Sequence, residues 1–220
     1  MRAILFTGIL VLLSCFAAIE ISWASQLHSS LHKYKNSQVS HLTLKRLSPY
    51  NGFINYYSQF AFFRRNHKVS PDFIRALIIA ESSVDPVAVS PKGAMGLGQI
   101  MFPTGKEAAR ELADSGYTFR HIKPQKLANL QKEDLFDPAI NILLTCYLIS
   151  KYNYKFNGKL ELVLSAWNAG EYHRELQRGR TVPYQETHNL IGKINAYYID
   201  LLQKRKRISV SSRQYVKQPD

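Results

Sequence analysis

Glu81 is an acidic residue within the apolar stripe of a predicted helix. At about 100° per residue, Ile74, Leu77 and Ile78 share one face of that helix, and Glu81 falls in the middle of the same face. Desolvation on such a face raises the pKa of a carboxyl group, and the negative end of the helix dipole shifts the pKa in the same direction. A carboxyl that stays partly protonated near neutral pH can act as a general acid. The alternative is a frayed helix end from which Glu81 turns to solvent.

A glycine-rich segment over residues 87–102 follows this helix. Its glycines at 93, 96 and 98 permit positive φ or a close approach between backbone and ligand. The amide of Gln99 can donate and accept hydrogen bonds to a ligand through both of its ends. We expect the segment to line a ligand groove beside Glu81, the alternative being a tight turn without ligand contact. Met101 and Trp167 are candidates either for this groove or for the core.

The candidates for a second catalytic carboxyl group beside Glu81 are few. Acid–base enzymes often use two carboxyl groups, one as the acid and the other as a base or nucleophile. Asp85 stands next to Pro86, and this pair is expected to end the helix and not to act in catalysis. Glu186 precedes Thr187 at a predicted helix start, where an acidic residue is common, so it is either a helix-cap residue or a site residue.

Helical patterns account for most of the chain beyond residue 51. Helices are predicted over 54–65, 71–84, 104–115, 138–154, 160–167 and 186–204. Residues 116–134 are polar and weakly patterned, which favours an insertion or a mobile loop. No stretch alternates like a long strand. The sequence therefore predicts one mostly helical, all-α domain over 51–203, with a short non-helical glycine-rich segment in its groove.

The two ends of the chain differ from this domain. A basic start, an apolar run from Ala3 to Leu13 and the small residues of Ser22-Trp23-Ala24 predict a signal peptide over 1–24, cut after Ala24. An uncleaved anchor and a lipid-modified Cys15 are the alternatives. We expect 25–50 to form a flexible basic leader and 204–220 a solvated basic tail. The protein is thus predicted to be exported to the periplasm or cell envelope.

Charge and cysteine content narrow the set of partners. The formal net charge of +13 predicts attraction to polyanions, of which the anionic cell envelope is the nearest for an exported protein. Nucleic acid is not expected, because no zinc spacing or RNA-binding signature is present. The histidines at 28, 32 and 41 lack metal-ligand spacing, so no metal is expected. Without the signal peptide, Cys146 is the only thiol; we expect it to be buried, and we expect no disulfide.

The stretch from Glu81 to Thr104 resembles the soluble lytic transglycosylases of the lysozyme-like superfamily. The matching residues are Glu81-Ser82, Pro86, Ala88, Ser90, Gly93-Ala94, Gly96-Leu97, Gln99, Met101 and Thr104. Three further segments follow in the family's order: Leu135-Phe136-Asp137-Pro138 with Asn141, Ala166-Trp167-Asn168-Ala169-Gly170, and Pro183-Tyr184-Gln185-Glu186-Thr187. The resemblance covers about residues 53–202.

The resemblance implies a lysozyme-like helical fold and cleavage of the β-1,4 bond between N-acetylmuramic acid and N-acetylglucosamine in peptidoglycan. It implies that Glu81 is the single catalytic acid and base, and that no cofactor is needed. The other residues matching groove positions are Ser90, Gln99, Met101, Asn168 and Glu186. Two departures are Trp167, where the family usually has tyrosine, and Met101-Phe102-Pro103, where proline more commonly follows the methionine directly. We expect Trp167 to alter substrate binding more than activity.

Three functions remain open at the level of sequence. The first is a lytic transglycosylase, in which Glu81 protonates the glycosidic oxygen and then deprotonates the C6 hydroxyl to give a 1,6-anhydro ring. The second is a hydrolytic muramidase, which needs a positioned water. The third is a non-catalytic glycan-binding or scaffold protein within a secretion or conjugation apparatus. An enzyme that accompanies such an envelope-spanning machine is compatible with the first.

Overall fold

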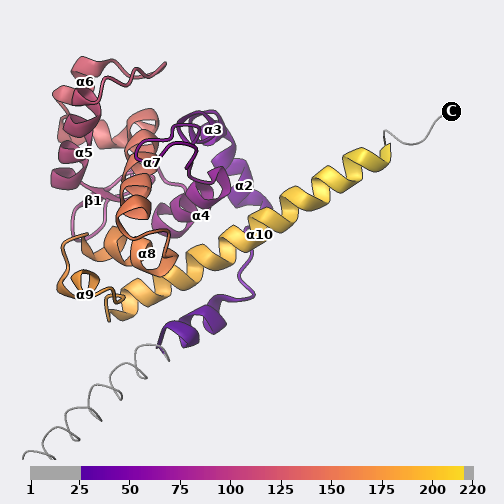
Figure 1. The fold of residues 1–220 in the computed structure, drawn as a ribbon. Helices are drawn as coiled ribbons and strands as arrows, with labels where there is room; N and C mark the ends of the chain where they lie inside the picture. Colours follow the sequence, from indigo (N-terminus) through magenta and orange to yellow (C-terminus); the bar gives the residue numbers. More distant parts are fainter. Residues whose placement is uncertain (1–25, 216–220) are drawn as a thin grey trace, which may run out of the picture.

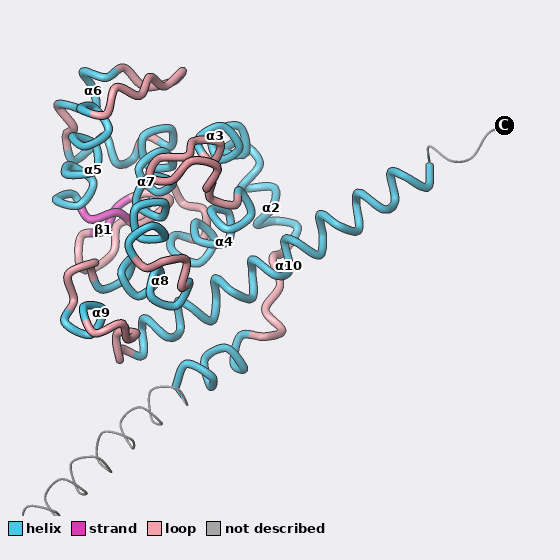
Figure 2. The backbone as a smooth tube through the Cα atoms, viewed as in Figure 1, coloured by secondary structure: helices cyan, strands magenta, loops and turns pink. Residues whose placement is uncertain are grey.

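Helices dominate the structure, a computed structural model that describes residues 26–215, with side chains described through Arg207. The only strands in this range form the short hairpin β1–β2 (Figure 2). After a helical stretch at 26–34, the elements are α2 (His41–Leu47), η1 (Ser48–Tyr50), α3 (Asn51–Tyr57), α4 (Pro71–Ser82), β1 (Ala94–Met95), β2 (Ile100–Met101), α5 (Phe102–Asp114), α6 (Pro124–Ala128), η2 (Lys132–Phe136), α7 (Pro138–Lys155), α8 (Leu160–Ala169), α9 (Arg174–Gln177) and α10 (Gln185–Tyr215). The predicted mostly helical single domain is confirmed, while the predicted signal peptide lies outside the described residues.

The helix α7 forms the centre of the domain (Figure 1). It packs against α3, α5, α8 and η2, and its residues from Ala139 to Ser150 are all buried. Asp137 caps its N-terminus by accepting a hydrogen bond from the backbone N–H of Ala139, and Pro138 occupies the first turn, where no N–H is needed. Cys146 is buried here and unpaired, and burial raises the pKa of its thiol. A structural role for this cysteine follows.

The helix α4 ends at Ser82, one residue after Glu81. Ser83 and Val84 both take positive φ, at 53° and 67°, and so reverse the chain direction. Positive φ is unusual for a β-branched residue, and the 4% exposure of Val84 shows that packing holds it there. This reversal folds the glycine-rich segment back beside α4.

The first aromatic helix is shorter than predicted. It ends at Tyr57 and not near residue 65. The aromatic side chains that follow pack away from a helical course, with Phe60 5.2 Å from Phe119 and Phe62 5.3 Å from Tyr147 between ring centroids. Burial of these rings against α7 and the 117–119 segment outweighs helical continuation.

Two other expectations about the middle of the chain are wrong. The helix α5 begins at Phe102 and not at Thr104, because Pro103 fits the first turn of a helix that has already begun. The stretch 116–134, expected to be an insertion or mobile loop, contains α6 and the start of η2. Its Leu127 and Leu130 are only 1% and 2% exposed, so this stretch belongs to the core.

The segment 26–50 is packed, contrary to the flexible leader that its polar composition predicts. The backbone N–H of Val39 donates to Asp200 at 2.9 Å, and the ammonium of Lys204 donates to the carbonyl of Val39 at 3.0 Å. The helical stretch 26–34 lies directly on α10, since a Cβ at Gly192 would stand 2.7 Å from the carbonyl oxygen of Ser30. Backbone contacts of this kind leave no trace in hydrophobic patterning.

The helix α10 packs against α4 and α8 and then continues away from the body (Figure 1). It spans 31 residues, well past the predicted end at 204, and it includes the first part of the predicted basic tail. Arg205 forms an ion pair with Asp72 of α4 at 2.9 Å, which gives one of these basic residues a structural role. No helix within residues 26–215 has the length and apolar character needed to cross a membrane.

Candidate active site

The centre of the site is the carboxyl group of Glu81, the second-last residue of α4. Ile74, Leu77 and Ile78 on the same helix face are fully buried, and Glu81 extends this face into a cavity of about 380 Å³. The helix does not fray before this point. All seven residues nominated from the sequence line this cavity: Glu81, Ser90, Gln99, Met101, Trp167, Asn168 and Glu186. The structure thus brings them together, although their individual roles stay predictions.

Trp167 of α8 holds the carboxyl of Glu81 in place. Its indole Nε1–H donates a hydrogen bond of 2.7 Å to Oε1 of Glu81. Indole is a donor only, so the bond has one possible direction. Trp167, expected from the sequence to contribute an N–H donor, therefore places that donor directly against the carboxyl.

The environment of Glu81 raises its pKa to about 7. Burial is the largest cause, because it disfavours the ionised form. The hydrogen bond from Trp167 works in the opposite direction, while the negative charge of Glu186 raises the pKa further and the positive charge of Lys193 lowers it. At neutral pH, a large share of the protein therefore carries a protonated Glu81 that can serve as a general acid.

The glycine-rich segment is fixed to α7 by Asn141. The Asn141 side chain, 1% exposed, donates to the carbonyls of Met95 and Leu135 at 3.0 and 2.8 Å and accepts from the N–H of Gly98 at 2.8 Å. A Cβ at Gly96 would stand 2.3 Å from the Leu135 carbonyl oxygen. A Cβ at Gly98 would likewise stand 2.3 Å from Oγ1 of Thr145. The absence of side chains at these two glycines is thus required by packing against α7, and the expectation of close approach to a sugar is corrected for them.

Gln99 has less freedom to bond a ligand than its amide suggests. It takes a positive φ of 52°, and its Nε2 donates to the carbonyls of Ala88 and Gly96 at 3.1 and 2.9 Å. Both amide hydrogens are therefore used within the protein. Only Oε1 is left to accept a bond from a ligand, which corrects the expectation that both ends of the amide are available.

The other site residues predicted from the sequence line the remaining walls of the cavity. Ser90 Oγ accepts from the N–H of Ala94 at 3.0 Å, and Met101 is exposed at the rim. Asn168 Oδ1 accepts a hydrogen bond of 2.5 Å from the hydroxyl of Thr187, which ties the end of α8 to the start of α10. Glu186 is held by Lys92 at 2.8 Å.

The cavity also contains residues that the sequence analysis did not nominate as site residues. They include Lys92, Thr104, Leu148, Tyr152 and Gly170. Lys92 lies between the motif residues Ser90 and Gly93, so its position was the available signal. Tyr152 carries no such signal, because only the packing of α7 brings it to the cavity. Asp85 is exposed and accepts from the N–H of Val87 at 3.0 Å, within the turn that follows α4; the helix has already ended at Ser82, before the predicted stop at Asp85-Pro86.

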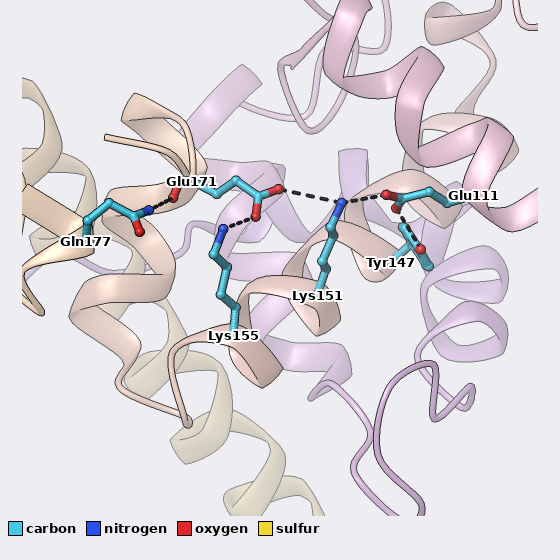
Figure 3. A network of polar contacts seen from close by, with 6 residues as sticks. All are labelled: Glu111, Tyr147, Lys151, Lys155, Glu171 and Gln177. Carbon is cyan, nitrogen blue, oxygen red and sulfur yellow. Dashed lines mark hydrogen bonds and ion pairs between the residues drawn. The ribbon is translucent and has the colours of Figure 1, made fainter. Parts of the chain in front are cut away.

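A network of charges stabilises the connection after α8, beside the cavity-lining Gly170 (Figure 3). Glu171, only 8% exposed, pairs with Lys155 at 2.5 Å and with Lys151 at 3.6 Å. Lys151 also bonds Glu111 of α5 at 2.7 Å, and Glu111 accepts from the hydroxyl of Tyr147. Because its members come from α5, α7 and this connection, the network fixes one wall of the cavity against the core.

The described residues offer no evident metal site. Between residues 26 and 215, no group of three or more histidine, cysteine, aspartate or glutamate side chains is arranged to hold a metal ion.

The part of the sequence that forms this cavity matches a known protein family. The family described as the transglycosylase SLT domain matches residues 60–189, more than half of the chain. The chain belongs to this family. The matched range contains Glu81 and all the other nominated residues.

Two curated proteins are similar to this chain in sequence. The putative soluble lytic murein transglycosylase of Haemophilus influenzae is 26% identical over an alignment of 164 positions, which covers 68% of this chain and 26% of that protein. The membrane-bound lytic murein transglycosylase E of Buchnera aphidicola subsp. Baizongia pistaciae is 31% identical over 146 residues, 64% of this chain and 57% of that protein. The chain thus spans about a quarter of the first relative's length and just over half of the second's.

Solved structures confirm the fold of the SLT domain. The 70 kDa soluble lytic transglycosylase of Escherichia coli superposes with a TM-score of 0.51 at 22% identity, covering 68% of this chain and 23% of that one. A complex of the 70 kDa soluble lytic transglycosylase with bulgecin A gives a TM-score of 0.57 at 20% identity, covering 75% of this chain and 26% of that one. At these identities the likeness concerns the fold alone.

Replacing Trp167 by phenylalanine tests how the indole acts in this SLT domain. The hydrogen bond from Trp167 favours ionised Glu81, so its loss raises the pKa of that carboxyl. We expect the alkaline limb of the pH–activity profile to move to higher pH and the maximal rate to fall about tenfold, because the acid loses its orientation. Trp167→Tyr, which keeps a donor group, serves as the control. An unchanged alkaline limb in Trp167→Phe would contradict this role.

Proposed function

We propose that this protein is a lytic murein transglycosylase, which cleaves the β-1,4 bond between N-acetylmuramic acid and N-acetylglucosamine in peptidoglycan without consuming water. The observation that carries the proposal is the carboxyl of Glu81, with a pKa of about 7, held by one indole donor in a cavity that could receive a sugar. The membership of the SLT domain family supports the same reaction class.

In the proposed reaction, Glu81 acts first as an acid and then as a base. The protonated carboxyl gives its proton to the glycosidic oxygen as the bond from this oxygen to C1 breaks, while the acetamido oxygen of the muramoyl residue stabilises the cationic centre. The resulting carboxylate removes the proton from the C6 hydroxyl, and O6 bonds to C1 to form the 1,6-anhydro ring. Glu81 ends protonated again. A pKa near neutrality suits both steps, since neither protonation state is strongly disfavoured.

A hydrolytic muramidase is the second candidate, and one observation favours it. Glu186 places a second carboxyl group in the cavity, as a hydrolase with two acidic residues requires. Its ion pair with Lys92 and its 64% exposed side chain argue against this role, because a base that activates water works best in a sheltered position. Mass spectrometry of digested murein separates the two candidates. Anhydro-muramoyl ends support the transglycosylase, and reducing ends overturn it.

The pH dependence of the reaction follows from the protonation state of Glu81 that the first step requires. Glu81 has to be protonated to donate, so we expect kcat/KM to decline above pH 7, by about tenfold per pH unit well above the pKa. Initial rates of murein solubilisation in buffers of constant ionic strength measure this decline. A rate that rises through this range would show that an ionised Glu81 starts the reaction, and the proposed order of steps would be wrong.

We further propose that the protein acts in the cell envelope, where its substrate lies. The predicted signal peptide and the net charge of +13 support this location. Association with an envelope-spanning secretion or conjugation apparatus stays a prediction from the family resemblance.

A further inference from the structure

Lys92 connects two segments that line the cavity, the glycine-rich segment and the start of α10. It lies in the turn before β1, and its ammonium group donates to Oε2 of Glu186, in the first turn of α10, at 2.8 Å. The two residues are 94 positions apart in the chain, so the tertiary fold alone brings them together. Among the described residues that line the cavity, Lys92 is the only lysine or arginine.

The ion pair between Lys92 and Glu186 can break easily, so that Lys92 can bind another anion. The side chains of Lys92 and Glu186 are 75% and 64% exposed, and pairs this exposed contribute little to stability. The lysine ammonium is a compact charge on a flexible stem, so it can turn to another anion within reach at small cost. The ammonium of Lys92 is therefore a charged donor that a ligand in the cavity can reach, in exchange for its exposed ion pair with Glu186.

The substrate class proposed above carries the complementary group. The muramoyl residue bears a lactyl ether whose carboxyl is free on peptide-free strands, while on substituted strands this carboxyl is an amide and the peptide supplies other carboxylates. Resting on the proposed function, we propose that Lys92 binds a carboxylate of the muramoyl substituent and so makes the cavity selective for anionic murein over neutral glycan. A charge-assisted hydrogen bond supplies the selectivity.

The neighbouring groups favour coupling between this contact and the acid. The charge of Glu186 raises the pKa of Glu81. When the ammonium of Lys92 turns from Glu186 to the ligand, the negative charge of Glu186 is less compensated. The protonated state of Glu81 is then favoured when an anionic ligand is in place.

The test compares the affinities of matched oligosaccharides, measured by calorimetry on the full chain carrying Glu81→Gln to prevent turnover. One ligand is a peptide-free murein tetrasaccharide with free lactyl carboxylates, and the second is the same sugar with these groups converted to carboxamides. A third carries stem peptides. Comparing the first and third ligands with the carboxamide distinguishes lactyl carboxylates from peptide carboxylates as the source of the charge.

We expect a carboxylate-bearing ligand to bind roughly fivefold more tightly than the carboxamide, and this ratio to fall to about one when Lys92→Gln is added. Adding Glu186→Gln should instead increase the ratio, because Lys92 loses its competing partner. A purely structural role of the pair predicts the same ratio in all three proteins. Lys132→Gln, which removes an exposed positive charge outside the cavity, controls for general attraction to the basic protein.

The outcomes separate the two proposals. If the ligands bind equally well to the parent protein, or if the preference survives Lys92→Gln, the role of Lys92 is overturned while the proposed function stands. If no murein ligand binds and wild-type protein releases no anhydro product, the proposed function fails and the role of Lys92 fails with it.

Discussion

Replacing Glu81 by glutamine should lower the rate of murein cleavage by about a hundredfold to ten-thousandfold, the range that general acid–base catalysis supplies. Glutamine has nearly the same shape and can still accept the hydrogen bond from Trp167, but it can neither donate a proton to the glycosidic oxygen nor take one from the C6 hydroxyl. Release of anhydro-muropeptides, followed by mass spectrometry, measures the loss. Glu133→Gln, at an exposed position on η2, is the matched control.

A stability measurement shows whether such a loss has the proposed cause. The pKa of Glu81 is raised to about 7 in the folded protein from a usual value of 4.5, so the folded state binds this proton more tightly than the unfolded state. The stabilisation is fully present below pH 4.5 and is lost as the pH rises through 7. Glu81→Gln lacks this dependence, and it should gain on the order of 1–3 kcal/mol relative to wild type between these limits.

The interpretation can be contradicted in two ways. Full cleavage activity in Glu81→Gln would favour the non-catalytic, glycan-binding alternative. A stability difference that does not change with pH would mean that the carboxyl is not desolvated as the structure indicates.

Replacing Asn141 by leucine should lower the free energy of unfolding by about 3 kcal/mol or more. Leucine has a similar volume, but it leaves the N–H of Gly98 and the carbonyls of Met95 and Leu135 unpaired in the interior. Each buried, unpaired polar group costs about 1–3 kcal/mol. Urea unfolding measures the change in the free energy of unfolding.

The same change should reduce activity even at temperatures where the variant stays folded, because the glycine-rich segment that carries Gln99 loses its attachment to α7. Asn195→Leu, a half-buried position on α10 outside this network, controls for the loss of any amide. Asn141→Asp keeps the shape and the acceptor for Gly98, but it faces the two carbonyls with an oxygen, so it should also be destabilised. A cost for Asn141→Leu no greater than that of the control would show that the segment is held by other contacts.

Much of the architecture could be predicted from local signals. Pro71 and Pro138 mark helix starts that the structure confirms, and the apolar spacing before Glu81 correctly placed its side chain on an inward face. The seven nominated groove residues also converge on one cavity. These features are local, or they rest on motif residues whose order along the chain follows a known family.

The errors share a different physical origin. The aromatic stretch after Tyr57 has a good helical pattern, but its rings gain more by packing against α7 and the 117–119 segment than by continuing the helix. The leader at 26–50 is held by Asp200 and Lys204, which are far away in sequence. The indole donor to Glu81 likewise joins residues 86 positions apart. Contacts of this kind depend on the assembled fold, and no window of sequence reports them.

The close packing of Gly96 and Gly98 on α7 also restricts how this protein can diverge over generations. Any side chain at either glycine would collide with Leu135 or Thr145, and any other residue at Asn141 leaves polar groups unpaired, so a single substitution at these three positions carries a penalty before a second can compensate. The exposed cavity residues Lys92 and Met101 bear no such packing constraint. In related proteins, substitutions in this part of the groove should therefore be found at Lys92 and Met101. They would change ligand binding, while Gly96, Gly98 and Asn141 stay the same.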